Sequence, residues 1–169
     1  STNNRKLLFK DNVLGTNEGI LLIETNHNDN SQNSEEEIVI VKKLYDYLLK
    51  QQISIDGITT SITSNDILVV APYNVQVNQL SQNLPKNNRT GTVDKFQGQE
   101  AAISILSMTA SDAEDAPRGM DFLFDHRRLN VAISRAQCLS IVVINKKLFK
   151  SRAININQIM ISNNFQKLK

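Results

Sequence analysis

The sequence is short of the residue types that mark several special classes of protein. It contains a single cysteine, Cys138, so a disulfide framework and a cysteine-based zinc site are excluded. The position of Cys138 inside an apolar run predicts a buried, unreactive thiol in a reducing compartment. No apolar run approaches the roughly 20 residues of a membrane-spanning helix, and the chain does not open with a secretory signal. We therefore expect a cytoplasmic protein with no membrane partner.

Glycine is also scarce, with six residues in the chain. These glycines form neither the GxxxxGK[ST] phosphate loop nor the GxGxxG dinucleotide motif, so a triphosphate cradle of the usual kind is excluded within this chain. Metal ligands are sparse as well, because His27 and His126 have no partner at a ligand spacing. The acidic residues of the segment 111–118 stand beside an arginine, which is typical of a solvated or salt-bridged turn. We expect no metal site.

An excess of charge of one sign is missing too, because 19 basic residues oppose 17 acidic ones and the formal net charge is +2. Net charge by itself therefore does not predict a polyanionic partner. What the chain does have is 169 residues of which 40% are apolar, enough for one domain with a buried core. It opens Ser-Thr-Asn without methionine, and residues 1–18 lack periodicity, so we expect an irregular lead-in from a longer protein.

Strand-like and helix-like segments alternate along the rest of the chain. Ser34 and Glu37 form a capping-box pattern ahead of apolar residues at helical spacing, whereas the polar segment 53–65 is expected to be a linker. The strongest apolar runs are typical of strands covered on both faces. The expected strands are 20–24, 66–71, 101–108 and 138–144, and the expected helices follow Ser34, begin at Tyr73 and span 127–136. This alternation predicts an α/β sandwich around a mostly parallel sheet.

Polar residues gather where the expected strands begin and end. Pro72, Tyr73 and Asn74 follow one strand, the segment 92–100 precedes another, and the loop from Thr109 follows it. In open α/β sheets, ligands bind beyond the carboxyl ends of the strands. We therefore expect these polar segments to share one edge of the sheet and to form the site there.

The helix 127–136 is cationic. Arg128 and Arg135 are seven residues apart, which on a helix places them on one face and about 10 Å apart along the axis. A guanidinium on a rigid helix is suited to stabilising charge on a transferring phosphoryl group. The alternative is that both arginines form ordinary ion pairs, for which the nearby acids are Glu100, Asp121 and Asp125.

Three segments together carry a family resemblance. APYNVQ (71–76), GTVDKFQGQE (91–100) and RRLNVAISRAQ (127–137) resemble, in order and spacing, motifs IV, V and VI of superfamily 1 helicases. They are most similar to the branch that contains the nonsense-mediated-decay RNA helicase and the Dna2-type helicase-nucleases, and the resemblance covers about residues 19–145. The loop 111–123 is similar to that of bacterial members in which this motor follows a RecB-like nuclease domain, which implies a fused nuclease and a role in DNA repair.

The resemblance implies a RecA-like three-layer sandwich over residues 19–150, the second of two motor domains, followed by a helical tail at 151–169. ATP with Mg²⁺ would bind between this domain and a first RecA-like motor domain of the same protein, which would carry the Walker lysine and the Mg²⁺ ligands. Arg135 would be the arginine finger on the γ-phosphate. The other residues implied on the nucleotide side are Gln97, Gly98, Glu100 and Arg128.

The resemblance also implies a track for single-stranded nucleic acid, with DNA favoured over RNA. Its residues would be Pro72, Tyr73, Thr92 and Asp94. Such contacts are made mostly to phosphates and position the strand without reading its sequence. The segment 92–100 would then lie between the strand track and the nucleotide and couple the two.

Two positions depart from the family pattern. Ser134 stands where the family usually has Thr, which keeps the hydroxyl, and Gln137 stands where a second Arg is usual. The lost charge leaves Gln137 outside the expected site. Tyr73 has an alternative interpretation as a core residue, because it lies on the apolar stripe of its helix, and Phe96 is expected to be a core anchor rather than a base-stacking platform.

The sequence therefore predicts a motor domain that is inactive without the first motor domain. The main alternative is a catalytically silent nucleic-acid-binding module of a nuclease or repair protein, in which Arg135 and Glu100 are dispensable. A further alternative, a nucleotide-binding regulatory domain that acts alone, is disfavoured by the missing phosphate loop.

Overall fold

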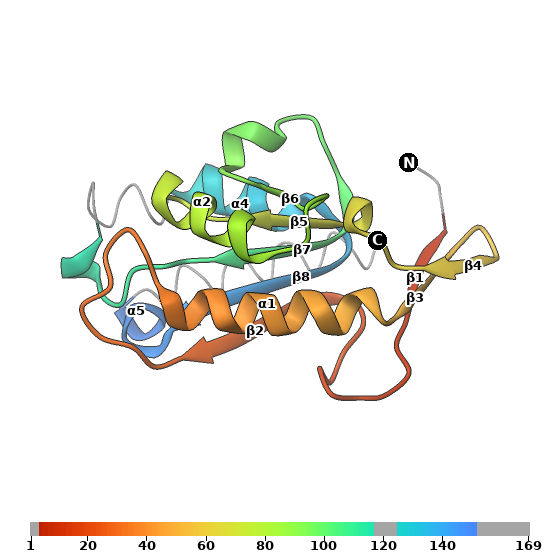
Figure 1. The fold of residues 1–169 in the computed structure, drawn as a ribbon, viewed down its shortest axis with the longest axis horizontal. Helices are drawn as coiled ribbons and strands as arrows, with labels where there is room; N and C mark the ends of the chain where they lie inside the picture. Colours follow the sequence, from red (N-terminus) through yellow and green to blue (C-terminus); the bar gives the residue numbers. More distant parts are fainter. Residues whose placement is uncertain (1–3, 117–124, 152–169) are drawn as a thin grey trace.

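A sheet of five parallel strands, in the order β2-β8-β7-β5-β6, forms the centre of the molecule (Figure 1). The structure is a computed structural model and describes residues 4–116 and 125–151. The strands are β2 (Gly19–Thr25), β5 (Ile67–Val70), β6 (Arg89–Gly91), β7 (Ala101–Ser107) and β8 (Ala136–Asn145). The prediction of an α/β fold around a parallel sheet is confirmed, and each expected strand is found within two residues of its expected bounds.

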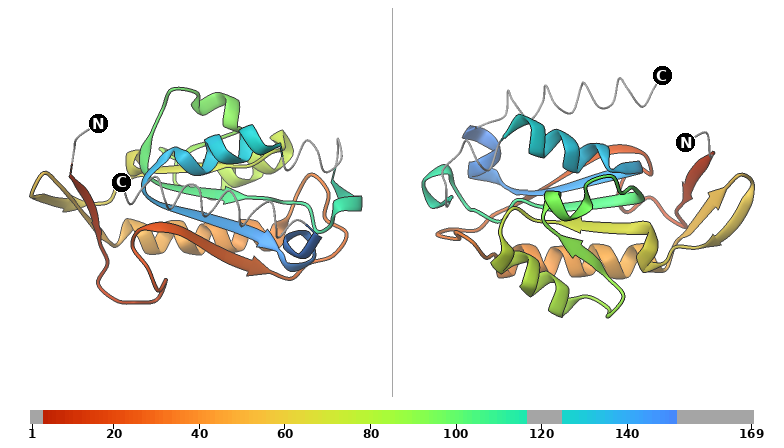
Figure 2. Two further views of the ribbon diagram at one scale, coloured as in Figure 1. Left: turned by 180° about the vertical axis from the view of Figure 1, so that it is seen from behind. Right: turned by 90° about the horizontal axis from the view of Figure 1, so that it is seen from above.

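Helices cover both faces of this sheet. On one face lie α1 (Glu35–Leu49) and α2 (Asn74–Asn83), and on the other lie α4 (His126–Ser134), α5 (Lys146–Ser151) and the short 3-10 helix η2 (Val93–Phe96) (Figures 1 and 2). Two separate apolar clusters fill the spaces between the sheet and these layers. The arrangement is a three-layer sandwich consistent with a RecA-like fold, and it explains why β5 and β7 are apolar at nearly every position, since all their residues are buried.

A second, smaller sheet lies beside the amino ends of the parallel strands, where two expectations were wrong. It contains β1 (Arg5–Leu8), β3 (Gln52–Ile55) and β4 (Ile58–Ser61), paired antiparallel in the order β1-β3-β4. The lead-in is therefore not irregular throughout, and the polar segment 53–65 is not a plain linker. Asp56 and Gly57 form the turn between β3 and β4 with φ of 51° and 85°, and an Asp-Gly pair between alternating residues is a recognisable hairpin signal.

The helix starts also differ in detail from the sequence patterns. The Ser34 hydroxyl accepts from the Glu37 backbone N–H at 3.2 Å, but the Ser34 N–H donates to the Gln76 side chain at 2.9 Å instead of to Glu37. The capping box is therefore only half formed, because the Glu37 side chain is drawn into the interior. Helix α4 begins at His126 and ends at Ser134, so that Ala136 is already part of β8.

The connections run along one face and return along the other. From β5 the chain passes through α2 to its neighbour β6, and then crosses β5 on the α4 side to reach β7. Because β6 and β7 are both parallel to β5, this crossover, residues 92–100, has to travel the whole way from the end where the strands finish to the end where they start. Two short 3-10 helices, η1 (Ser64–Asp66) and η3 (Ala113–Asp115), complete the described elements.

Within residues 4–116 and 125–151, no helix is long and apolar enough to cross a bilayer. Several sequence expectations fall on other residues. Arg118, Asp121, the second half of the loop from Thr109 and the tail beyond Ser151 lie outside the described residues.

Candidate functional site

The predicted site residues divide between the two ends of the sheet. Pro72 and Thr92 follow β5 and β6, and Arg128 lies in the first turn of α4, so all three are at the carboxyl end. Glu100 and Arg135 directly precede β7 and β8, at the amino end. A strand of seven residues such as β7 separates these ends by roughly 20 Å. The expectation that one edge would hold every polar segment is therefore wrong.

At the carboxyl end, a shallow hollow opens beside α4. Its lining residues are Pro72, Thr92, Val93, Leu106, Met108, Arg128, Leu129 and Ala132. The structure thus brings together residues from three segments that are far apart in sequence and that the family resemblance had singled out. An apolar floor with one hydroxyl and one guanidinium at its rim suits a sugar-phosphate backbone, which offers apolar sugar faces and anionic oxygens.

Arg128 is placed with the residues expected on the nucleic-acid side rather than with Glu100. Its Nη1 lies 3.4 Å from Asp94 Oδ2, and the two side chains are 43% and 72% exposed. An exposed ion pair of this length is weak, so the guanidinium can exchange this carboxylate for a phosphate at little cost. Asp94 was not among the acids expected to pair with this arginine, Glu100, Asp121 and Asp125, of which Asp121 lies outside the described residues.

Asp125 instead caps the first turn of α4. Its Oδ1 accepts from the backbone N–H groups of Arg127 at 2.9 Å and Arg128 at 3.1 Å. The bond from the Arg128 N–H, joined by the bond from Arg127 and the charges of both guanidinium groups, lowers the pKa of Asp125 below its usual value. Asp125 thereby fixes where α4 begins and so where Arg128 enters the hollow.

Tyr73 is a core residue in this structure. It is buried and packs in the apolar cluster on the α4 side of the sheet, directly before α2. Val77, Leu80 and Leu84, the apolar residues that follow it at helical spacing, pack in the cluster on the opposite face. Phe96 is buried in the same cluster as Tyr73, which confirms its expected role as a core anchor.

At the amino end, Arg135 is the C-cap residue of α4. Its carbonyl oxygen accepts from the Ala101 N–H at 3.1 Å and its own N–H donates to Val131 O at 3.1 Å, so its backbone is held at the start of β7 and β8. Its Nε is buried and has no acceptor among the described residues. A buried donor without a partner is costly and uncommon in a folded protein.

The segment before β7 ends beside this arginine, since Ala101 bonds to its carbonyl oxygen. Gln97, Gly98 and Glu100 are all exposed, and Gly98 has a φ of 76° with open space where a Cβ would stand. This left-handed conformation favours glycine, so the backbone turns toward β7 with no side chain above it. Exposed polar side chains and an uncovered backbone are what a ligand at this end would meet.

Gln137, which the family resemblance had left outside the expected site, lies with Glu100 at the amino end of the sheet. Its Nε2 donates to Glu100 Oε2 at 3.1 Å and its Oε1 accepts from Arg5 Nη1 at 2.5 Å. Arg5 comes from β1, far away in sequence, and its Nε is buried without an acceptor among the described residues. No local pattern identifies such a residue, because only the packing of the small sheet against β8 brings it here.

The crossover 92–100 connects the two groups. It starts at Thr92 in the hollow, is anchored in the core by Phe96, and ends at Glu100. Lys95 folds back so that its Nζ donates to Thr90 O at 2.9 Å, and its side chain packs where a Cβ at Gly91 would collide with it at 2.4 Å. The crossover is therefore fixed in the middle, with a half-buried start at Thr92 and an exposed end at Glu100.

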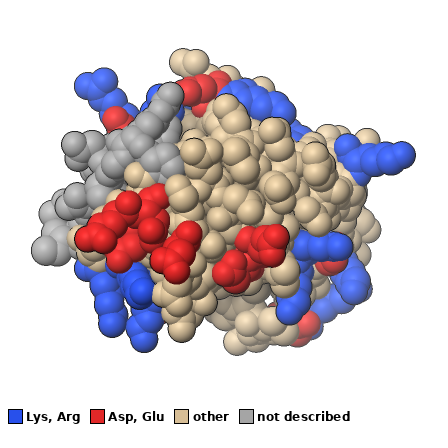
Figure 3. Space-filling model, turned by 60° about the vertical axis from the view of Figure 1, so that its left-hand side comes forward, with Lys and Arg blue, Asp and Glu red and all other residues tan. Residues whose placement is uncertain are grey.

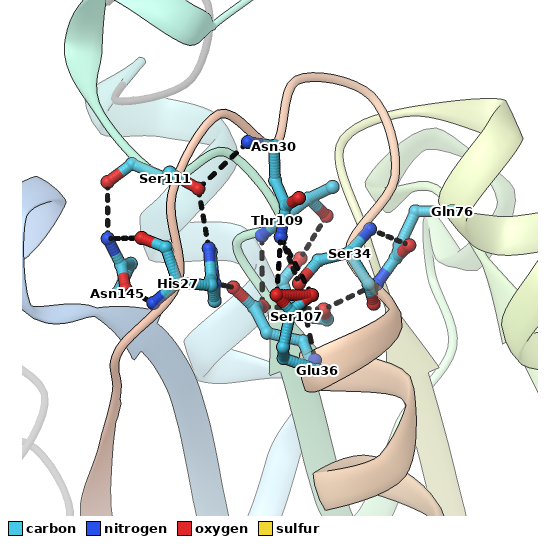
Figure 4. Close-up of polar contacts among 10 residues, drawn as sticks. His27, Asn30, Ser34, Glu36, Gln76, Ser107, Thr109, Ser111 and Asn145 are labelled. Atoms are coloured by element: carbon cyan, nitrogen blue, oxygen red, sulfur yellow. Dashed lines mark hydrogen bonds and ion pairs between the residues drawn. The ribbon is translucent and has the colours of Figure 1, made fainter.

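The largest feature that the sequence did not predict is a buried polar network at the carboxyl end (Figure 4). His27 Nε2 lies 2.7 Å from Glu37 Oε2, and both side chains are fully buried. Glu37 Oε1 accepts from the Ser107 hydroxyl at 2.8 Å and from the Thr109 N–H at 3.0 Å. His27 Nδ1 lies 2.6 Å from Ser111 Oγ. Thr109 is held with a φ of 76°, which is strained for a β-branched residue.

Two amides extend the network sideways. Gln76 Oε1 accepts from the Ser34 N–H at 2.9 Å, and Gln76 Nε2 donates to Ser34 O and Ser107 Oγ, each at 3.2 Å. Asn145 Oδ1 accepts from the His27 N–H at 2.7 Å, and Asn145 Nδ2 donates to His27 O at 3.0 Å. The network joins the ends of β2, β7 and β8 to the first turns of α1 and α2.

This network occupies the crevice in which parallel α/β sheets usually bind ligands. The crevice is filled by the chain's own polar groups, in agreement with the absence of a phosphate loop. Polar residues that end apolar strands, such as Ser107 and Asn145, were the one available signal. Within the described ranges no group of His, Cys, Asp or Glu could hold a metal ion.

Acidic side chains gather on the surface near this end of the molecule (Figure 3). The exposed acids of the loop after β2, the start of α1 and η3 are Asp29, Glu35, Glu36 and Glu114. A polyanion is repelled by such a face. The hollow beside α4, with Arg128 at its rim, is therefore the better place for nucleic acid at the carboxyl end.

The chain matches the protein-family model described as AAA domain over residues 4–147. It is 31% identical over 131 residues to the putative helicase mov-10-B.1 of Danio rerio, covering 68% of this chain and 13% of that protein. It is 32% identical over 99 residues to the DNA-binding protein SMUBP-2 of Mesocricetus auratus (57% and 10%), and 34% identical over 96 residues to the RNA helicase Mov10l1 of Mus musculus (53% and 8%). The chain thus spans 13% or less of the length of each of these relatives. The name of SMUBP-2 mentions DNA, and the name of Mov10l1 mentions RNA.

Proposed function

Because the chain belongs to the AAA domain family and is homologous to superfamily 1 helicases, we propose that it is the second RecA-like motor domain of an ATP-dependent nucleic-acid helicase. One observation carries the proposal. The polar and cationic residues form two groups at opposite ends of α4, and a single anchored segment, residues 92–100, runs from one group to the other. A motor domain needs this arrangement, because nucleotide and nucleic acid have to be bound apart and yet be coupled.

On the nucleotide side, Arg135 is the proposed arginine finger. Its backbone is held by bonds to Ala101 and Val131, and its buried Nε has no acceptor among the described residues. A donor is therefore left for an anionic oxygen brought by a ligand. ATP with Mg²⁺ would supply the phosphoryl group and part of the charge neutralisation, with the Mg²⁺ ligands on the first motor domain. Gln97, Gly98 and Glu100 provide the exposed surface beside Arg135.

On the nucleic-acid side, the proposed contacts are Pro72, Thr92 and Arg128 around the hollow, with Asp94 as the ion-pair partner that Arg128 gives up on binding. Arg128, which the resemblance implied on the nucleotide side, belongs to this side in the proposal because it lines the hollow with Thr92. Tyr73 supports the floor from the core. Such contacts hold the backbone of a single strand without reading its sequence.

The coupling would follow from the crossover. Closing the nucleotide cleft against Arg135 and Glu100 shifts the end of the segment 92–100, and its anchor at Phe96 transmits the shift to Thr92 at the strand track. Repeated closing and opening on hydrolysis would advance the strand stepwise. The chain alone lacks a phosphate loop and would not hydrolyse ATP.

The test is ATP hydrolysis by the full-length protein, with and without single-stranded DNA and single-stranded RNA, for the wild type and Arg135→Ala. The expected result is strand-stimulated hydrolysis that falls by a factor of about 10³ in the variant, as loss of an arginine finger can cause. Arg127→Ala is the matched control, because Arg127 is an exposed arginine on the same helix and has no place in the proposed site.

The polymer that stimulates hydrolysis, DNA or RNA, identifies the substrate. The sequence resemblance favours DNA, whereas the relatives include both a DNA-binding protein and RNA helicases. Wild-type turnover in Arg135→Ala would instead make Arg135 a structural residue and the domain a nucleic-acid-binding module. The same nucleic-acid affinity with and without ATP would support that second interpretation.

A further inference from the structure

Arg5, Gln137 and Glu100 form a hydrogen-bonded chain at the amino end of the sheet. Arg5 Nη1 donates to Gln137 Oε1, and Gln137 Nε2 donates to Glu100 Oε2. A guanidinium only donates and an ionised carboxylate only accepts, so these two partners leave a single orientation for the Gln137 amide. Arg5 is 132 residues from Gln137 in sequence, and Gln137 is 37 residues from Glu100.

The consequence falls on Glu100. Its side chain is exposed, and an exposed glutamate samples several rotamers that a ligand has to restrict when it binds. The bond from Gln137 restricts the carboxylate in advance and occupies Oε2. The other oxygen, Oε1, is left to accept from a ligand, and the vicinal hydroxyls of a ribose are donors of the right kind.

Arg5 is not explained by the fold alone. It is partly buried, and its Nε is buried without an acceptor among the described residues. A guanidinium recruited only for packing is expected to have its buried nitrogens paired. The guanidinium is instead directed at Gln137, a residue that itself contacts the exposed carboxylate.

We propose that Arg5 and Gln137 are positioning residues for nucleotide binding and act through Glu100 on the ribose of ATP. The proposal rests on the function proposed above, since it requires a nucleotide at the amino end of the sheet. It makes strand β1, which lies outside the motor domain expected from the sequence, part of the nucleotide site.

The experiment compares kcat and KM of the full-length protein, at saturating stimulating strand, for wild type, Arg5→Gln and Gln137→Leu. With ATP, both variants are expected to raise KM about tenfold and to leave kcat within about twofold, because ordering one carboxylate contributes to binding rather than to chemistry. With 2′,3′-dideoxy-ATP, which lacks both hydroxyls, the variants are expected to match the wild type. Lys6→Gln, an exposed neighbour on β1, is the control and leaves both constants unchanged.

A double-mutant cycle adds a readout that a purely structural role does not move. In the Glu100→Ala background, Arg5→Gln is expected to have no further effect on KM, because its effect passes through Glu100. If Arg5→Gln or Gln137→Leu has a lower thermal midpoint than the wild type, Gln137→Glu separates positioning from loss of stability. This variant keeps an acceptor for Arg5 but repels the Glu100 carboxylate. It is therefore also expected to raise KM for ATP.

The two proposals fail in different ways. Unchanged KM in Arg5→Gln and Gln137→Leu, with strand-stimulated hydrolysis intact in the wild type, overturns the positioning role and leaves the motor standing. An equal rise in KM for ATP and for 2′,3′-dideoxy-ATP also overturns the positioning role, because Glu100 then does not bind the ribose hydroxyls. Absence of any stimulated hydrolysis in the wild type overturns both.

Discussion

The two ends of the central sheet differ in how their buried ionisable side chains are paired. At the carboxyl end, the ring nitrogens of His27 and the carboxylate oxygens of Glu37 all have partners within the chain. At the amino end, the Nε atoms of Arg5 and Arg135 are buried without an acceptor among the described residues. An unpaired buried donor costs free energy, so it is tolerated where something else supplies the acceptor. The carboxyl end also holds buried atoms without a partner among the described residues, the oxygens Thr25 Oγ1 and Asn33 Oδ1. What distinguishes the amino end is that its unpaired groups are guanidinium donors, which suit an anionic ligand.

The largest expected effect is on the buried network. Glu37→Ala should lower the free energy of unfolding by about 3–5 kcal/mol, because it leaves His27, the Ser107 hydroxyl and the Thr109 N–H without their common acceptor. Equilibrium urea denaturation measures this loss of unfolding free energy. Glu35→Ala, an exposed glutamate in the same helical turn, is the control and should cost under about 1 kcal/mol. A loss below about 1 kcal/mol for Glu37→Ala would break the comparison.

The next effect concerns the exposed part of the same end. Arg128→Gln in the full-length protein should weaken single-strand binding severalfold and reduce the slope of log K against log salt by about one, because one phosphate contact is lost. Fluorescence anisotropy titrations over a range of salt concentrations measure both quantities. Arg127→Gln is the matched control. An unchanged salt slope for Arg128→Gln would remove the hollow from the strand track.

The amino end should respond little in stability. Arg135→Met keeps the apolar stem and removes the buried, unpaired Nε, so the free energy of unfolding should stay within about 0.5 kcal/mol or rise slightly. The same urea denaturation assay applies, and the comparison with Glu37→Ala is direct. A loss above about 2 kcal/mol would mean that Arg135 is a structural residue, against its proposed role.

The smallest effect involves a polar pair near the surface. The Tyr47 hydroxyl donates to Asp11 Oδ1 at 2.7 Å, and desolvation, together with this bond and the Asp11 charge, raises the pKa of Tyr47 to about 12. The neutral phenol is therefore favoured in the folded state, and the stability it contributes is present below pH 10 and is lost as the pH rises through about 12. Absorbance titration of the phenolates should show Tyr47 titrating late together with the buried Tyr45, whose pKa desolvation also raises. The late signal should lose one tyrosine in Tyr47→Phe and shift down in part in Asp11→Asn.

Much of the fold could be read from the sequence because its signals are local. The apolar runs of β5, β7 and β8 and the helical spacing after Ser34 depend only on neighbouring residues, and each element was found close to its expected position. The hairpin of β3 and β4 was missed although its Asp-Gly turn was readable. The polar composition of segment 53–65 favoured a linker over a hairpin, because β3 and β4 both carry exposed residues.

The candidate site was predicted by residue type better than by place. Thr92 and Pro72 do share a hollow, but Arg128 joins them instead of joining Glu100. The reason is that α4 runs from the carboxyl end of the strands toward their amino end, so its first turn lies beside Thr92 and its C-cap lies at the start of β8. Helical spacing does not say which residues stand beside each of the two arginines.

The sequence by itself determined the class of fold, the order of its elements and the residue types at the two proposed binding ends, since these follow from periodicity, apolar runs and short motifs. Tertiary structure alone decided the contacts between distant segments. His27 meets Asn145, 118 residues away, and Arg5 meets Gln137, 132 residues away. Which polar groups pair and which stay unpaired depends on how strands and helices stack, because a hydrogen bond needs its two atoms within about 3 Å.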